Sequence, residues 1–98
     1  MTKRRVVITG LGAVTPFGVG VDKFWNSLVE GKSGISTSEL IDIDKHVVKI
    51  SGECKNFNPE EYLDPKEAKK MDRFIQFAMI AADEAIKDAK LEEVKDVD

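Results

Sequence analysis

The sequence has very little of the residue types that build catalytic and metal sites. Its 98 residues contain one cysteine and one histidine, so no internal disulfide can form and no pattern of zinc ligands is present. It also contains no HExxH, CxxC or GxSxG motif, which excludes the common metalloprotease, thiol-redox and serine-hydrolase signatures. Taken by itself, the chain has no complete active site, and we expect no cofactor.

Long apolar runs are also missing. The apolar stretch that directly follows the basic residues 3–5 covers only residues 6–8, whereas a signal-peptide core needs roughly 7–15 apolar residues. No segment approaches the about 18 or more apolar residues of a membrane span. A single cysteine gives no reason to expect an oxidising compartment. We therefore expect a cytoplasmic protein that does not bind a membrane.

The charge balance excludes one further class of partner. Fifteen basic and 18 acidic side chains give a net charge of −3, which provides no overall attraction to nucleic acid. The composition is 42% hydrophobic and 34% charged, typical of a globular protein. Any electrostatic partner must therefore be recognised by a local patch.

The N-terminal half predicts two strands and one helix. Residues 5–9 (RVVIT) contain three consecutive β-branched apolar positions, typical of a strand that is covered on both faces. Asp22 is expected to cap a helix over residues 23–30. Residues 32–46 are polar and predict a surface loop, and residues 47–54 predict a second strand.

The C-terminal half predicts helices. Asn58 and Asp64 each precede a proline that suits the first position of a helix, so we expect one short turn followed by a longer helix. The helical pattern runs from residue 65 to about residue 89, with a break or kink near residues 71–73. Residues 74–82 contain one polar side chain, so this stretch must be covered on several sides.

These elements do not make a closed fold. Two strands form a marginal sheet, and both residues 5–9 and residues 74–82 require protein around them. The pattern indicates that the chain is an incomplete part of something larger, or half of a tight assembly.

The glycine pair Gly10 and Gly12 raises the alternative of a dinucleotide site. Such a site needs a third glycine or alanine and a helix that opens at the glycines. Here Thr15 stands at the third position, Pro16 follows it, and no acidic residue ends a second strand about 20 residues later. The context favours a tight structural turn, in which glycine permits close backbone packing.

Four basic residues have helical spacing: Lys66, Lys69, Lys70 and Arg73. On one helix they would share a face, which would suit a phosphate, a nucleic acid or an acidic protein. An ordinary solvated face is the alternative, and the lack of interleaved exposed aromatics argues against nucleic acid.

Several segments of the chain, in order, resemble the N-terminus of the β-ketoacyl-acyl carrier protein synthases, most closely those of the elongating ketosynthase II type. The segments are RRVVITGLGAVTPFG, FWNSLVEGKSGI, KNFN and KKMDRFIQFAMIAADEAIKDA. The resemblance implies an α/β, thiolase-like fold, with five αβαβα layers in the complete enzyme and a homodimeric assembly. Residues 1–98 would then be an incomplete N-terminal segment of the synthase N-terminal domain.

The resemblance also implies an activity, namely acyl transfer in fatty acid biosynthesis. The family elongates an acyl chain, held as a thioester on a cysteine, by decarboxylative condensation with malonyl-acyl carrier protein. Its Cys-His-His set lies downstream of this region. Cys54 and His46 do not match that set, so we expect no catalytic residue in this chain and no activity from it alone. A non-catalytic relative such as a chain-length factor, or a stand-alone interaction module, is the alternative.

A partner and its contact residues follow from the same resemblance. In the resembling enzymes, basic residues at the positions of Lys66, Lys69 and Lys70 help to dock the acidic helix of acyl carrier protein, which bears the acyl and malonyl groups. Arg73 is added to this set from helical spacing alone. Ala68, which lies between the lysines, adds no charge.

Overall fold

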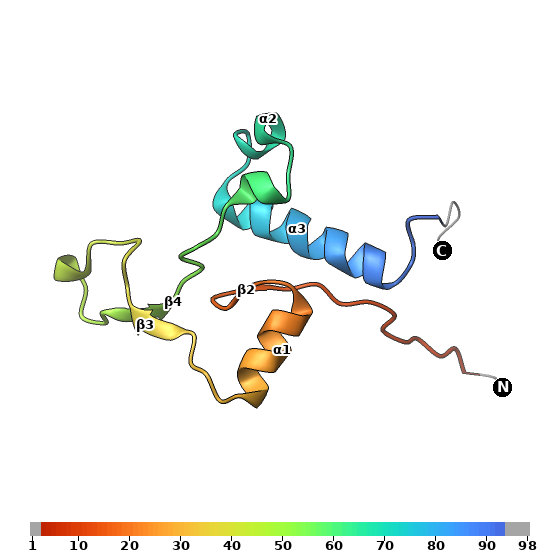
Figure 1. Cartoon of the computed structure of the whole chain (residues 1–98), viewed down its shortest axis with the longest axis horizontal. Coiled ribbons are helices and arrows are strands. Elements are labelled where there is room, and N and C mark those ends of the chain that lie inside the picture. The colour runs from red at the N-terminus through yellow and green to blue at the C-terminus, as the bar shows by residue number, and fades with distance from the viewer. Residues whose placement is uncertain (1–2, 94–98) are drawn as a thin grey trace.

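The computed structural model describes residues 3–93 of the chain. Their elements follow in the order β1 Val14–Thr15, β2 Gly18–Val19, α1 Val21–Val29, β3 Ile35–Thr37, the 3-10 turn η1 Ile43–Lys45, β4 Ile50–Gly52, the 3-10 turn η2 Pro59–Glu61, α2 Pro65–Ala68 and α3 Arg73–Asp88. The radius of gyration is 17.2 Å, against about 13 Å for a compact domain of 100 residues. The chain is therefore extended (Figure 1).

The strands form two separate antiparallel pairs. β1 pairs with β2 in the register Val14↔Val19, and β3 pairs with β4 in the register Ser36↔Ser51. The β1–β2 hairpin lies between α1 and α3. The β3–β4 pair lies apart from this hairpin, at the left of the view in Figure 1. β3 lies in the predicted loop over residues 32–46, and β4 fills only part of the strand predicted over residues 47–54. Strands of two or three residues, such as these and β1 and β2, are hard to predict because they leave little periodic signal.

The strand predicted over residues 5–9 does not form. The side chains of Val6 and Ile8 are 94% and 83% exposed, and no strand is assigned to this segment. β-branched residues favour a strand only where a partner strand completes the hydrogen bonds. No described segment supplies that partner.

The helix predicted over residues 23–30 is present as α1, but its N-terminal cap is not the predicted one. α1 begins after Gly20, and Asp22 lies inside the first turn without a side-chain capping bond, so the predicted cap at Asp22 is wrong. The end of the helix follows the expected glycine pattern. Gly31 has a φ of 75°, and the amides of Gly31 and Lys32 donate to the carbonyls of Leu28 and Ser27, which closes the last turn.

The helix starts and the break in the C-terminal half are confirmed. The Asn58 side chain accepts from the Glu60 amide at 3.2 Å, and the Asp64 side chain accepts from the Lys66 amide at 3.1 Å. α2 ends at Ala68 and α3 begins at Arg73. The four basic residues therefore do not lie on one continuous helix.

The described residues bury very little apolar surface. Ala68 and Ile80 are the only buried hydrophobic residues among residues 3–93. Phe74 on α3 remains 69% exposed, and Trp25 on α1 remains 61% exposed. The described part of the chain therefore supplies only part of the cover that residues 74–82 were expected to need: Ile80 is buried, whereas Phe74 and Met79 remain exposed.

Candidate functional site

The glycine loop is held by two acidic side chains of α3. The two carboxylate oxygens of Glu84 accept hydrogen bonds from the Ala13 amide at 2.9 Å and from the Val21 amide at 3.0 Å. Asp88, one turn later on α3, accepts from the Leu11 amide at 3.0 Å. Amides of this kind would be needed to bind a pyrophosphate. Because carboxylates occupy them, the loop is a structural turn and not a nucleotide site.

The two glycines allow this loop to approach the helix backbone. A Cβ atom at Gly12 would overlap the carbonyl group of Ala81, and one at Gly10 would overlap the carbonyl of Ala85. Glycine is therefore required at both positions by contact and not by a positive φ. This confirms the interpretation of the glycine pair as a close-packing turn.

The three predicted docking lysines lie at the junction of α2 and α3. Lys66 is in α2, Lys69 follows its last residue, and Lys70 is in the turn that leads to α3. All three side chains are exposed. None forms an ion pair with another residue of the described range 3–93, so this surface carries three neighbouring positive charges.

Arg73 has a different environment from the lysines. Its guanidinium donates a hydrogen bond to the carbonyl oxygen of Cys54. The guanidinium carbon also lies 5.5 Å from the ring centroid of Phe57 and 5.1 Å from that of Phe77. These distances are typical of cation–π contacts. The structure thus separates Arg73 from the set of basic residues to which helical spacing assigned it.

Nearly the whole chain matches one protein family. A family model described as "Beta-ketoacyl synthase, N-terminal domain" matches residues 3–97. The chain belongs to this family. The match covers the glycine loop, the lysine-bearing junction and α3.

Relatives of the β-ketoacyl synthase family agree with this assignment. The 3-oxoacyl-[acyl-carrier-protein] synthase 2 of Staphylococcus aureus (strain COL) is 48% identical over 89 residues, which are 91% of this chain and 22% of that protein. The synthase 2 of Synechocystis sp. is 46% identical over 91 residues, or 93% of this chain and 22% of that protein. The chain therefore spans about a fifth of the length of these curated relatives.

A solved structure supports the predicted fold class. The chain matches a structure titled "The ishigamide ketosynthase/chain length factor" with a TM-score of 0.81 and 32% identity, covering 94% of this chain and 23% of that one. This confirms the prediction of an α/β, N-terminal portion of a thiolase-like fold. The proteins that this chain matches are more than four times as long as the chain.

The single cysteine and the single histidine of the chain do not lie in environments that would make them reactive. Burial raises the pKa of the Cys54 thiol, and the positive charge of Arg73 only partly offsets that rise. A raised thiol pKa leaves less of the reactive thiolate at neutral pH. His46 is exposed, and its backbone carbonyl accepts from the Lys49 ammonium at 3.0 Å. Cys54 is therefore a half-buried thiol and His46 a surface residue.

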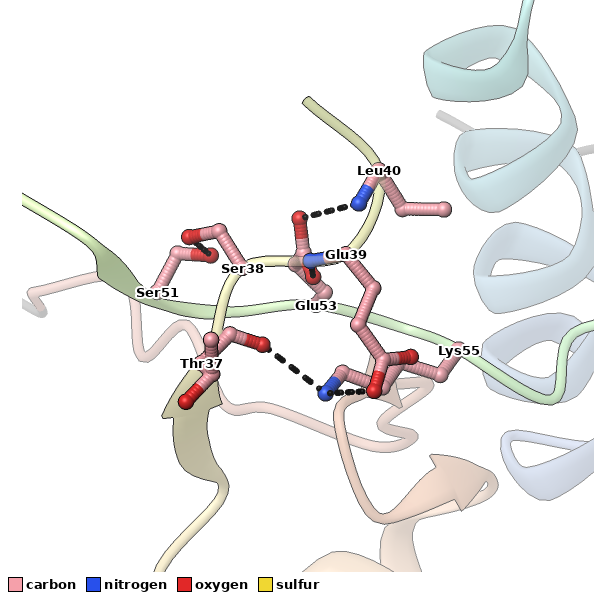
Figure 2. A network of polar contacts seen from close by, with 7 residues as sticks. All are labelled: Thr37, Ser38, Glu39, Leu40, Ser51, Glu53 and Lys55. Atoms are coloured by element: carbon pink, nitrogen blue, oxygen red, sulfur yellow. Dashed lines mark hydrogen bonds and ion pairs between the residues drawn. The ribbon is translucent and has the colours of Figure 1, made fainter. Parts of the chain in front are cut away.

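The β3–β4 region holds a polar network that the sequence did not predict (Figure 2). The Glu53 carboxylate accepts from the amides of Glu39 at 2.8 Å and Leu40 at 3.2 Å. These bonds, the Glu39 amide above all, lower the pKa of Glu53. Lys55 forms an ion pair with Glu39 at 3.2 Å. The members of the network bind one another, so it stabilises the hairpin and offers no free group for chemistry.

Two hollows lie on the surface of residues 3–93. One of about 370 Å³ is lined by Lys23, Cys54 and Phe57, and one of about 1020 Å³ by Glu67, Met79 and neighbouring residues. No group of three or more possible metal ligands occurs among residues 3–93. Within the same range no helix has the length and apolar character needed to cross a membrane. The exposed lysine junction is therefore the best-defined candidate site.

Proposed function

We propose that this chain is the N-terminal segment of a 3-oxoacyl-[acyl-carrier-protein] synthase that elongates acyl chains in fatty acid biosynthesis. The identity of 48% to a synthase over 91% of the chain supports this function. In the proposed reaction, loss of CO₂ from a malonyl thioester leaves a carbanion equivalent. The carbanion attacks an enzyme-bound acyl thioester and expels the cysteine thiolate, which forms a β-ketoacyl chain two carbons longer.

The chain itself contributes no catalytic residue to this proposal. The nucleophilic cysteine and the two histidines that stabilise the enolate would come from protein outside residues 1–98. That same protein would cover the apolar side chains that residues 3–93 leave exposed, Ile8 and Phe74 among them. A cytoplasmic homodimer is part of the same proposal.

The proposed role of this segment is to dock the acyl carrier protein. The observation that carries it is the group of three exposed lysines, Lys66, Lys69 and Lys70, without an ion-pair partner in the described range. An acidic carrier protein complements such a surface, and long-range attraction between them would speed their encounter. The carrier would bring the acyl and malonyl groups as thioesters.

The test is a set of charge reversals in the complete synthase. We expect the triple variant Lys66→Glu, Lys69→Glu, Lys70→Glu to raise the KM for malonyl-carrier protein about 10- to 100-fold at low salt, since each exposed ion pair contributes about 0.2–1 kcal/mol and reversal adds repulsion. The difference should shrink at about 0.5 M salt because exposed charges are screened.

A matched control changes the same charge elsewhere. The triple variant Lys32→Glu, Lys45→Glu, Lys90→Glu alters three exposed lysines outside the junction, and its KM should stay within about twofold of the parent value. If the junction variant keeps the parent KM at low salt, the docking proposal is wrong. If the complete protein binds malonyl-carrier protein but forms no β-ketoacyl product, it is a non-catalytic relative instead.

A further inference from the structure

The junction between α2 and α3 is a tight break in the helical backbone. On the α2 side, the amides of Lys70 and Met71 donate to the carbonyls of Glu67 and Ala68, both at 3.1 Å. On the α3 side, the carbonyl of Asp72 accepts the first bonds of the new helix. The two hydrogen-bond series thus meet between Met71 and Asp72. The direction in which Lys69 and Lys70 project depends on how this point is held.

Two side chains from the start of α3 hold this point. The Gln76 side-chain amide donates to the carbonyl of Ala68 at 3.0 Å, which ties the end of α2 to α3. The Arg73 guanidinium donates to the Cys54 carbonyl, which ties the start of α3 to the irregular segment between β4 and η2. The Ala68 carbonyl thus accepts two hydrogen bonds, one from the Met71 amide and one from Gln76.

The Arg73 contact uses the shape of the guanidinium and not only its charge. The rings of Phe57 and Phe77 meet edge to face, with centroids 4.8 Å apart and planes at 75°. The guanidinium carbon lies within 5.5 Å of both centroids. A planar, weakly hydrated guanidinium can stack on rings and donate in its own plane at the same time, whereas an ammonium group is a compact and strongly hydrated charge.

We propose that Arg73 is a positioning residue that fixes the lysine-bearing junction, residues 66–72, and is not itself a docking charge. This inference rests on the proposed docking function. It reverses the assignment that helical spacing makes for Arg73. The partner acts on Lys66, Lys69 and Lys70, while Arg73 holds the backbone that presents them.

The test compares two variants of Arg73 in the complete synthase. Arg73→Lys keeps the positive charge and loses the planar group, and Arg73→Gln loses both. We expect both variants to raise the KM for malonyl-carrier protein by about three- to tenfold with little change in kcat. The slope of log KM against log salt should remain that of the parent, because the number of charge contacts with the carrier is unchanged. A single Lys69→Gln change should lower that slope.

Two results would overturn the inference. One is a parent-like KM for Arg73→Lys together with a raised KM for Arg73→Gln, which would show that the charge alone matters. The other is a salt slope that falls for Arg73→Gln as much as for Lys69→Gln, which would make Arg73 a direct contact. Lys87→Gln, an exposed change on the same helix, is the matched control and should alter neither quantity.

Hydrogen exchange separates this inference from the docking proposal. In Arg73→Lys, the amides of Lys70 and Met71 should exchange faster than in the parent, while the melting temperature stays within a few degrees. Faster exchange with a parent-like KM for the lysine variants would refute docking and retain the positioning of the junction. Unchanged exchange at these amides would refute the positioning, whatever the carrier affinity.

Discussion

Residues 6–9 and residues 10–21 follow each other directly in the chain, yet they lie in opposite environments. In the first segment Val6 and Ile8 are almost fully exposed. In the second, three backbone amides are bound by Glu84 and Asp88, and the glycines pack against the backbone of α3. The second segment therefore finds its partner within the described chain, whereas the first one does not.

The predicted strand at residues 5–9 does not form, whereas the predicted turn at Gly10 and Gly12 does, because the two structures need different partners. A β-branched run becomes a strand only when neighbouring strands accept and donate its hydrogen bonds. The glycine loop needs only one helix, and α3 supplies small residues, Ala81 and Ala85, at the point of contact. We propose that the rest of the synthase provides the strand neighbours.

Loss of the close contact between the glycine loop and α3 should destabilise the protein most. Gly12→Val would drive a side chain into the Ala81 carbonyl, and we expect the complete synthase to lose about 3 kcal/mol or more of unfolding free energy. Gly31→Asn is the control, because Gly31 has a positive φ and open space around it, and asparagine tolerates that backbone. Equal denaturation midpoints for the two variants would contradict the close packing.

A truncation in residues 6–9 tests whether this exposed segment is buried in the complete protein. Ile8→Ala should lower the unfolding free energy of the complete synthase by about 2–4 kcal/mol, the range for truncation of a buried isoleucine. Ile8 is exposed among the described residues, so such a loss must come from contacts with other protein. A loss below about 0.5 kcal/mol in urea unfolding would show that Ile8 stays in solvent.

The carboxylate bonds to the glycine loop give a smaller effect. Glu84→Gln leaves one acceptor oxygen for two amides, and we expect a loss of about 1–2 kcal/mol in thermal or denaturant unfolding. Asp83→Asn is the matched neighbour on α3; its exposed ion pair with Lys87 should contribute less than about 0.5 kcal/mol. If the two variants are equally stable, Glu84 does not hold the loop.

The β3–β4 network should give the smallest effect, and it depends on pH. The pKa of Glu53 is lowered in the folded chain, so its stabilising bonds are present above the ordinary carboxyl pKa and are lost as the pH falls through the lowered value. After correction for intrinsic rates, exchange of the Glu39 and Leu40 amides should speed up below about pH 4. Protection that persists unchanged at pH 3 would contradict the role of Glu53.

The sequence predicted the elements that depend on local chemistry. The caps at Asn58 and Asp64 and the break before Arg73 were all recognisable, because a cap or a break needs only a few neighbouring residues. The start of α1 was missed by two residues, since Gly20 leaves no side-chain signal. The polar network around Glu53 was also missed.

The candidate site was predicted less completely, for a related reason. Charge and spacing singled out the lysines at positions 66, 69 and 70, whose docking role stays a prediction. The contacts of Arg73 were not predicted. Phe77 lies four residues later on the same helix, but Phe57 is 16 residues earlier in the chain and no periodic pattern connects it to Arg73. Helical spacing grouped Arg73 with the lysines, and only the observed end of α2 at Ala68 separates them.

A urea titration of residues 1–98 alone, followed by far-UV and near-UV circular dichroism, tests most directly whether this segment takes its order from a larger synthase. Because so little apolar surface is buried among residues 3–93, we predict a gradual loss of helix signal and no near-UV transition of Trp25. A single cooperative transition with the same midpoint in both spectral regions would contradict the account.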